Sequence, residues 1–155
     1  MNDDRPILRI ESGSDFLELD ATIEEEPTLQ SLGDAYVTVI VQAGGFGGRN
    51  DLWVQREQIE EFVAQLAALD RNLSGEARLS APSPDELELV VRAVTSRGHV
   101  ALCGTTGYFI QRENGRYWHA VSFGFEFEPS QIATALRHSW LSRYASDESP
   151  ATLRG

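Results

Sequence analysis

The sequence contains no lysine: its 13 basic residues are all arginine, and they stand against 24 aspartate and glutamate residues, for a formal net charge of −11 at pH 7. Without lysine the chain cannot build a P-loop, whose lysine contacts the phosphates of a bound nucleotide. A negative field also repels nucleic acid and anionic membranes and attracts basic proteins. We therefore expect no nucleic-acid partner and no membrane partner, and a basic protein is the binding partner that the charge favours. The alternative is that the negative charge only keeps the protein soluble.

Cysteine and long hydrophobic runs are scarce as well. The single cysteine, Cys103, excludes an internal disulfide. No stretch approaches the roughly 18 to 20 apolar residues that a membrane-spanning helix needs. The first residues, Met1–Pro6, have neither the basic nor the apolar region of a secretory signal. These features predict a cytoplasmic protein.

The remaining composition fits one globular domain. The chain has 155 residues, of which 41% are hydrophobic and 24% charged, and such values are ordinary for a folded domain. We expect a single α+β domain over residues 1–144 and a flexible C-terminal tail over residues 145–155, which are mostly small and polar. Negative charge is concentrated near the start, because residues 1–34 hold ten acidic residues and two arginines, a net of −8.

Alternation of apolar and polar residues predicts about six to seven strands. These fall at residues 16–23, 36–41, 52–54, 76–81, 87–93, 99–112 and 116–127. Asn114-Gly115 is the strongest hairpin signal, because a type I′ turn needs a positive φ at both central residues. If these two residues form the turn, Cys103 lies opposite Glu126 and His119 lies opposite Ile110.

Two segments have the spacing of amphipathic helices. The first covers residues 56–69, with apolar residues at Ile59, Phe62, Val63, Leu66 and Leu69. The second begins at Pro129-Ser130 and carries Ile132, Leu136 and Trp140. The order of elements predicts a mostly antiparallel β-sheet with two helices packed on one face. We expect the row Phe123, Phe125 and Phe127 at the centre of the core, opposite small residues and against the helices.

The glycine run Gly44-Gly45-Phe46-Gly47-Gly48 begins like a dinucleotide-binding motif but does not complete it. Asn50 occupies the place of the third glycine, and the next residues, 52–54, are typical of a strand where the motif needs a helix. We interpret the run as a flexible hairpin or bulge that exposes Phe46 as a contact point for a partner.

No motif for catalysis or metal binding is found. In the expected hairpin, Cys103 and His119 lie about 23 Å apart, at ~3.3 Å per strand residue, which is too far for one metal ion. No serine lies in a Gly-x-Ser-x-Gly turn, and Cys103 lies beside an acid, which does not favour a thiolate. We therefore expect no catalytic residues, no cofactor, no metal and no enzyme activity.

Tyr117 and Trp118 lie near the tip of the expected hairpin, next to Arg112. Aromatic residues and arginine are enriched in protein interfaces, which makes Trp118 a candidate contact residue. The alternative is that Trp118 covers an edge of the core.

The chain resembles the WapI-type immunity family of bacteria and related uncharacterised bacterial domains over residues 34–141. The matching segments are Asp34-Ala35-Tyr36-Val37, Gly45-Phe46-Gly47, Phe62-Val63-Ala64-Gln65-Leu66, Gly75-Glu76-Ala77, Leu87-Glu88-Leu89, Gly98-His99-Val100 and Phe123-x-Phe125-x-Phe127. Family members carry Asn-Trp-Leu where this chain has Ala35-Tyr36-Val37. The resemblance implies a small cytoplasmic protein that binds a cognate toxin and blocks it.

The charge pattern favours the same class of function, because an acidic inhibitor associates quickly with a basic toxin. The candidate contact acids are Glu24, Glu25 and Glu26 in an exposed connection and Glu57, Glu60 and Glu61 on the first helix. Two alternatives stay open. One is a protein-binding or scaffold domain without a toxin, monomeric or homodimeric through an edge strand or the glycine run. The other is a small-ligand protein or enzyme with a pocket near Tyr108, Trp118 or His119.

Overall fold

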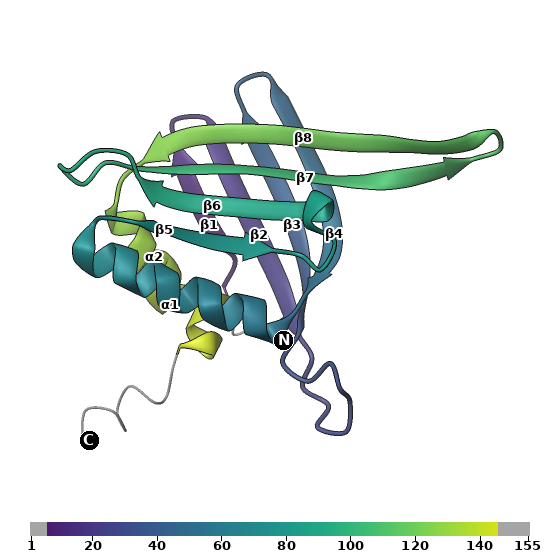
Figure 1. The fold of residues 1–155 in the computed structure, drawn as a ribbon, viewed down its shortest axis with the longest axis horizontal. Helices are drawn as coiled ribbons and strands as arrows, with labels where there is room; N and C mark the ends of the chain where they lie inside the picture. The colour runs from purple at the N-terminus through teal and green to yellow at the C-terminus, as the bar shows by residue number, and fades with distance from the viewer. Residues whose placement is uncertain (1–5, 146–155) are drawn as a thin grey trace.

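The computed structural model describes residues 6–145 and contains two antiparallel four-stranded sheets, each followed by a helix (Figure 1). The first half comprises β1 (Leu8–Ser12), β2 (Asp15–Ile23), β3 (Ala35–Ala43), β4 (Phe46–Val54) and α1 (Arg56–Asn72). The second half comprises β5 (Glu76–Ser80), β6 (Leu87–Ala93), β7 (Val100–Arg112), β8 (Gly115–Phe127) and α2 (Ser130–His138). Within each sheet the strands are adjacent in chain order. Short 3₁₀ helices cover Pro84–Glu86 and, after α2, Trp140–Tyr144, here named η2.

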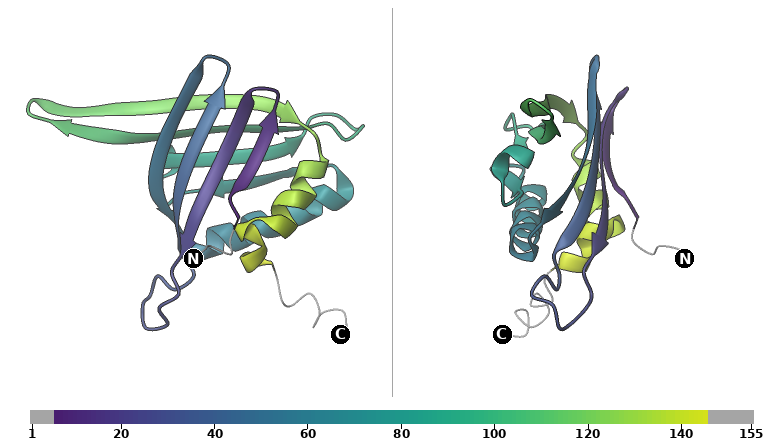
Figure 2. Two further views of the ribbon diagram at one scale, coloured as in Figure 1. Left: turned by 180° about the vertical axis from the view of Figure 1, so that it is seen from behind. Right: turned by 90° about the vertical axis from the view of Figure 1, so that its right-hand side faces the viewer.

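The two sheets lie face to face with their strands crossing steeply, and the two helices close one side of the gap between them (Figures 1 and 2). Helix α1 packs against β5 and α2, and α2 also contacts β1. A small interior void of about 10 Å³ marks where all layers meet, since its lining comes from both sheets and both helices: Leu17, Leu19, Phe62, Leu66, Leu89, Leu102 and Ile132 among others. The core therefore lies between the sheets.

The expected α+β class and antiparallel pairing are confirmed, but the expected strand count is wrong. Residues 6–145 form eight strands in two sheets, where about six to seven strands in one sheet were expected. The missed strand is β1, whose five residues bury only Leu8 and Ile10. The helices do not cover one face of a single sheet as expected: they close one side of the gap between the two sheets, where α1 packs on β5 and α2 contacts β1 (Figure 1). Of the tail expected over residues 145–155, residues 146–155 lie outside the described residues.

The turn expected at Asn114-Gly115 is also wrong: the observed turn lies one residue earlier in the chain. Arg112 pairs with Gly115, so the two turn residues are Glu113 and Asn114. Gly115 has a φ of 148°, and Asn114 has no positive φ, which excludes the type I′ turn expected for Asn114-Gly115. Cys103 consequently lies opposite Gly124, and His119 lies opposite Tyr108.

The same shift changes the partners of the phenylalanine row. Phe123 lies opposite Gly104, but Phe125 lies opposite Leu102 and Phe127 opposite Val100. Phe123 and Phe127 are buried, and Phe125 is partly buried against the core. The row thus faces the core as expected, with a small residue opposite Phe123 alone.

The glycine run forms a hairpin turn between β3 and β4. Ala43 pairs with Phe46, which leaves Gly44 and Gly45 as the two turn residues. Gly44 has a φ of 62°, a value that glycine adopts without strain. The remaining glycines, Gly47 and Gly48, belong to β4. The run is therefore a tight turn continued by a strand.

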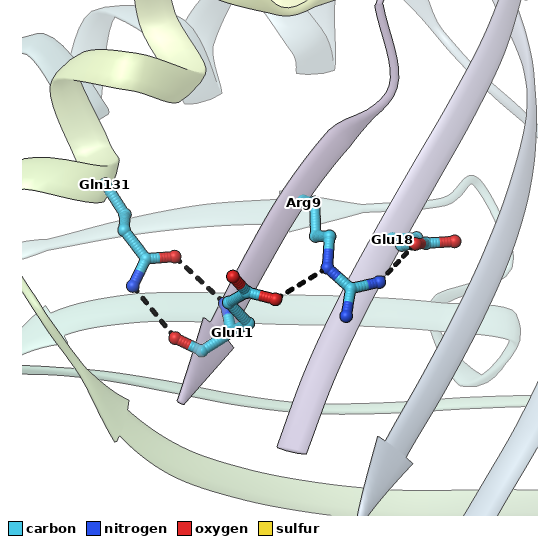
Figure 3. A network of polar contacts seen from close by, with 4 residues as sticks. All are labelled: Arg9, Glu11, Glu18 and Gln131. Carbon is cyan, nitrogen blue, oxygen red and sulfur yellow. Dashed lines mark hydrogen bonds and ion pairs between the residues drawn. The ribbon is translucent and has the colours of Figure 1, made fainter. Parts of the chain in front are cut away.

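Helix α2 is held to the edge strand β1 by one side chain (Figure 3). The Gln131 amide accepts from the Glu11 N–H at 2.9 Å and donates to the Glu11 carbonyl at 2.8 Å. Arg9 donates to the carboxylates of Glu11 and of Glu18, and these hydrogen bonds, that to Glu11 first, raise the pKa of Arg9. The edge of β1 is thereby blocked by a helix.

Replacing Gln131 by alanine is expected to lower the free energy of unfolding by about 1–3 kcal/mol, because two backbone groups of Glu11 lose their partner. Urea unfolding followed by circular dichroism measures the change. Gln111→Ala is the matched control, because its amide contacts only the local backbone of the β7–β8 turn. An equal effect of both variants would contradict a docking role for Gln131.

Candidate functional site

The acids that the sequence singled out in two separate segments lie at one end of the first sheet. Ile23 pairs with Ala35 and Ala35 pairs with Val54, so the end of β2, the start of β3 and the end of β4 are adjacent. The connection 24–34 and the start of α1 must therefore meet there. We name this surface the acidic end and define it by Glu24, Glu25, Glu26, Glu57, Glu60 and Glu61.

A depression of about 480 Å³ lies between the two segments of the acidic end. Its lining includes Glu24, Glu25 and Glu60, together with Arg56, Arg143 and Tyr144. Backbone hydrogen bonds hold the connection in place, from the Glu24 N–H to the Asp34 carbonyl and from the Gly33 N–H to the Glu24 carbonyl, both 2.9 Å. The Tyr144 hydroxyl donates to the Gly33 carbonyl at 2.7 Å. The depression is thus bounded by a hydrogen-bonded connection.

Carboxylates outnumber guanidinium groups at the acidic end by six to two. Arg143 contacts Glu25 at 3.4 Å, and Arg56 contacts Glu57 at 3.3 Å. Within residues 6–145, no ion pair involves Glu24, Glu26, Glu60 or Glu61. A hydrogen bond from its own backbone N–H, and then one from Arg56, lower the pKa of Glu57, so this carboxylate stays ionised as the pH falls. The acidic end therefore carries a negative field into solvent.

A second surface is a two-stranded arm formed by residues 107–120 of β7 and β8. The last pair between β6 and β7 is Leu87 with Thr106, so beyond this point β7 and β8 pair only with each other. Figure 1 shows the arm projecting past β4. Four aromatic residues on it are exposed: Tyr108, Phe109, Tyr117 and Trp118. An aromatic ribbon of this kind is a candidate contact surface.

The aromatic residues of the arm lie on both of its faces. Phe109 and Trp118 are opposite each other with ring centroids 4.8 Å apart, and Arg116 lies over the Phe109 ring at 3.9 Å. On the other face, the ring centroids of Tyr108 and His119 are 5.9 Å apart. Trp118 is 40% exposed and lies outside the core cluster. A contact role for Trp118 stays a prediction.

The structure does not bring all of the expected contact residues together. Phe46 is 73% exposed beside the β3–β4 turn. This turn lies at the opposite end of the first sheet from the acidic end, about 30 Å away along nine strand residues at ~3.3 Å each. Trp118 lies on the arm, which belongs to the second sheet. The expected contact residues thus lie on three separate surfaces: the acidic end, the β3–β4 turn and the arm.

Asn50 forms a structural contact between the sheets that was not predicted from the sequence. Its amide nitrogen donates to the Gly107 carbonyl at 2.9 Å, the Thr106 hydroxyl at 3.0 Å and the Glu86 carbonyl at 3.2 Å. Asn50 therefore ties β4 to the point where the arm leaves the second sheet. Its even position in β4, together with Leu52 and Val54, was a signal that its side chain points inward.

A hollow of about 210 Å³ lies at the root of the arm, between Gly47–Asn50 of β4 and Tyr108, His119 and Val121. The polar side chains that line it are those of His119, Arg49, Asn50, Thr106 and Tyr108. The amide nitrogen of Asn50 already donates the hydrogen bonds described above.

In the part of the chain that the structure describes, no three His, Cys, Asp or Glu residues are grouped so that they could hold a metal ion. Cys103 is half-buried in the middle of β7.

Comparisons with known proteins identify no family. No family model matches the chain, and no curated protein matches it. Among solved structures, the chain is similar to one from crystal structures of Trypanosoma bruciei MRP1/MRP2, with a TM-score of 0.39, 10% sequence identity and 88% of each chain covered. At this TM-score and identity the likeness establishes neither a shared fold nor a shared function. The resemblance to the WapI-type immunity family stays a prediction.

No helix within residues 6–145 is both long enough and apolar enough to cross a membrane.

Proposed function

We propose that this chain is a non-enzymatic binding protein whose acidic end docks on a basic surface of another protein, and that it acts as an immunity protein that binds and neutralises a cognate toxin. The observation that supports the proposal is the fold's assembly of acids from residues 24–26 and from α1 around one depression. Of these acids, Glu24 and Glu25 line the depression together with Glu60, which is 35 or more residues away in the sequence, so their proximity follows from the sheet pairing.

The acidic end suits fast association with a basic partner. The exposed carboxylates of the acidic end attract a positively charged protein over a distance of about one Debye length, which is ~8 Å at physiological salt. Such steering raises association rates by roughly 10–10³-fold and weakens as salt is added. The net charge of −11 on the whole chain also attracts a basic partner. The expected signature is an association rate that depends strongly on salt.

The depression also offers a place for one basic side chain of the partner. Glu24, Glu25 and Glu60 line it, and Arg143 from the chain itself already contacts Glu25 there. An arginine of the partner that entered the depression would meet these carboxylates and the side chain of Tyr144. The acidic end thus combines attraction at long range with a defined contact at short range.

The test is binding to the toxin-like protein encoded beside this gene, measured by surface plasmon resonance across a salt series. The triple variant Glu24→Arg/Glu25→Arg/Glu60→Arg is expected to slow association by about tenfold or more. The matched control, Asp85→Arg/Glu113→Arg/Glu128→Arg, makes the same change in net charge away from the acidic end and is expected to have a much smaller effect. Binding that does not depend on salt, or an equal loss in both variants, would contradict the proposal.

A further inference from the structure

The outer face of the first sheet, which points away from the second sheet, carries an exposed aromatic pair, Tyr36 and Trp53. No helix within residues 6–145 crosses β2, β3 or β4 on this face (Figure 2). Tyr36 lies opposite Trp53 on β3 and β4, and the two residues are 42% and 46% exposed. Their ring centroids are 5.3 Å apart, with an angle of 59° between the rings. The fold thus holds two large aromatic rings together in solvent, and residues of this kind are enriched where partners bind.

We propose that the Tyr36–Trp53 pair binds an arginine side chain of the basic partner, with the guanidinium over the rings and near the carboxylates of Asp20 and Asp51. The inference rests on the proposed function for the basic character of the partner. It adds a short-range arginine site on the outer face of the first sheet to the long-range attraction of the acidic end.

The aromatic pair is continuous with the acidic end. β3 begins at Ala35 and β4 ends at Val54, and these two residues pair where the connection 24–34 and helix α1 meet. Tyr36 and Trp53 are the next pair along the same two strands. A basic protein that is attracted to the acidic end therefore comes within reach of the two rings.

The arm holds an arginine on an aromatic pair of nearly the same geometry. Phe109 and Trp118 also lie opposite each other on two strands, with ring centroids 4.8 Å apart and an angle of 60° between the rings. Arg116 lies over the Phe109 ring at 3.9 Å. A cross-strand pair with this tilt therefore leaves a ring face open to a guanidinium.

A second example lies on the outer face of the first sheet itself and includes carboxylates. Arg9 lies over the Phe16 ring at 4.3 Å. The same guanidinium donates to Glu11 at 2.8 Å and to Glu18 (Figure 3). One ring and two carboxylates on neighbouring strands thus hold an arginine on this face. Within residues 6–145, no arginine lies over Tyr36 or Trp53.

Two carboxylates lie one row further along the same face as the aromatic pair. Asp20 and Asp51 both pair with Thr38, two residues after Tyr36 on β3, so each is a diagonal neighbour of Tyr36. Diagonal neighbours in a sheet lie about 7–8 Å apart, within reach of long side chains. Asp51 contacts Arg49 at 3.6 Å, and in the described part of the chain no ion pair involves Asp20. A guanidinium over the Tyr36 ring would therefore lie near both carboxylates.

Arginine fits this arrangement better than lysine. A planar guanidinium stacks on an aromatic ring and donates hydrogen bonds from its edge to carboxylates at the same time. The ammonium of lysine is compact and more strongly hydrated, so it loses more on leaving water for the ring. The expected signature of the site is a preference for arginine over lysine that depends on the Tyr36–Trp53 pair.

The first test needs no toxin and uses hexa-arginine and hexa-lysine peptides, whose side chains carry the same charge. Calorimetric titration of the full chain gives the ratio of the two affinities. Trp53→Leu keeps an apolar side chain but removes the ring, and it is expected to lower the arginine-to-lysine ratio by about two- to fivefold. Trp118→Leu is the matched control, because Trp118 is similarly exposed at 40% and its ring pair already holds Arg116. Trp53→Phe keeps a ring and is expected to keep most of the preference.

The second test uses the toxin-like protein encoded beside this gene. Trp53→Leu and Tyr36→Leu are each expected to raise its dissociation rate by about tenfold or more and to leave the salt-dependent association rate unchanged, since no charge is altered. If the toxin-like protein does not bind at all, the proposed function fails, and the peptide ratio alone decides the arginine site.

Two results would overturn the arginine site while leaving the acidic end as a docking surface. One is an arginine-to-lysine ratio that is the same in folded Trp53→Leu as in Trp118→Leu, with folding checked by circular dichroism. The other is a dimer of the unaltered chain that Trp53→Leu dissociates in sedimentation equilibrium, because a second copy would then cover the aromatic pair.

Discussion

Replacing Asn50 by aspartate is expected to lower the free energy of unfolding by about 3–5 kcal/mol at neutral pH, because the change buries an unpaired charge. Asn50 is only 7% exposed. Its amide nitrogen faces two carbonyl oxygens, those of Glu86 and Gly107. An aspartate oxygen in the same place would repel both carbonyls. Urea unfolding at neutral pH measures the change.

The pH dependence separates this charge from a mere loss of hydrogen bonds. Burial beside carbonyl oxygens raises the pKa of the new carboxyl in the folded state, so the folded protein binds a proton that the unfolded chain releases. The deficit of Asn50→Asp relative to Asn50→Ala is therefore expected to shrink as the pH falls through this raised pKa. Asn50→Ala leaves the Gly107 carbonyl without this donor and is expected to cost about 1–3 kcal/mol. Equal stabilities of the two variants at neutral pH would contradict the placement of Asn50.

Local alternation was sufficient to predict most elements but not their assembly. The strand expected at 16–23 is observed as Asp15–Ile23, and the helix expected at 56–69 as Arg56–Asn72. β1 was missed because only two of its five residues are buried. The division into two sheets was missed because β4 and β5 have the same alternating pattern as strands that pair, and helix α1 separates them.

The turn between β7 and β8 was placed wrongly because alternation does not fix register to within two residues. Pairing Arg112 with Gly115, as observed, and pairing Glu113 with Arg116, as expected, leave the same side chains on each face. The observed register differs from the expected one in the φ of Asn114 and in the packing of Phe123 beside Gly104. Neither feature can be predicted from the Asn114-Gly115 dipeptide alone.

The candidate surfaces were predictable in composition and not in position. The acids at 24–26 and on α1 were evident as exposed charge, but only the pairing of β2, β3 and β4 brings them together. The arm was not predicted because it begins where β6 stops pairing with β7, and the sequence does not give this pairing. A signal did exist, since the segment expected for β6 is about half as long as those expected for β7 and β8, and a short strand cannot pair along a long one.

Replacing Trp140 by alanine is expected to lower the free energy of unfolding by about 3–5 kcal/mol, as is typical for removing a large buried aromatic residue. Trp140 is 1% exposed and is among the largest fully buried side chains within residues 6–145. Its indole N–H donates to the Leu19 carbonyl at 2.8 Å, which joins η2 to the first sheet. Trp140→Phe keeps most of the volume and is expected to cost about 1–3 kcal/mol for the lost hydrogen bond. Thermal unfolding by calorimetry gives both values, and equal costs would contradict the cavity as the main cause.

The same residue connects the core to the acidic end, so its loss is expected to affect binding beyond its effect on stability. Trp140 packs edge-on against Tyr144 with ring centroids 6.0 Å apart, and Tyr144 holds the 24–34 connection through its bond to the Gly33 carbonyl. At a temperature where Trp140→Ala stays folded, the rate of dissociation from the proposed basic partner is expected to rise. The association rate is expected to stay the same, because the charges are unchanged. Tyr144→Phe, which removes only the hydroxyl, is expected to produce the same kinetic pattern at a smaller cost in stability. A fall in the association rate instead would show that the order of the connection contributes to steering itself, since charges on a loosened segment no longer present one concentrated field.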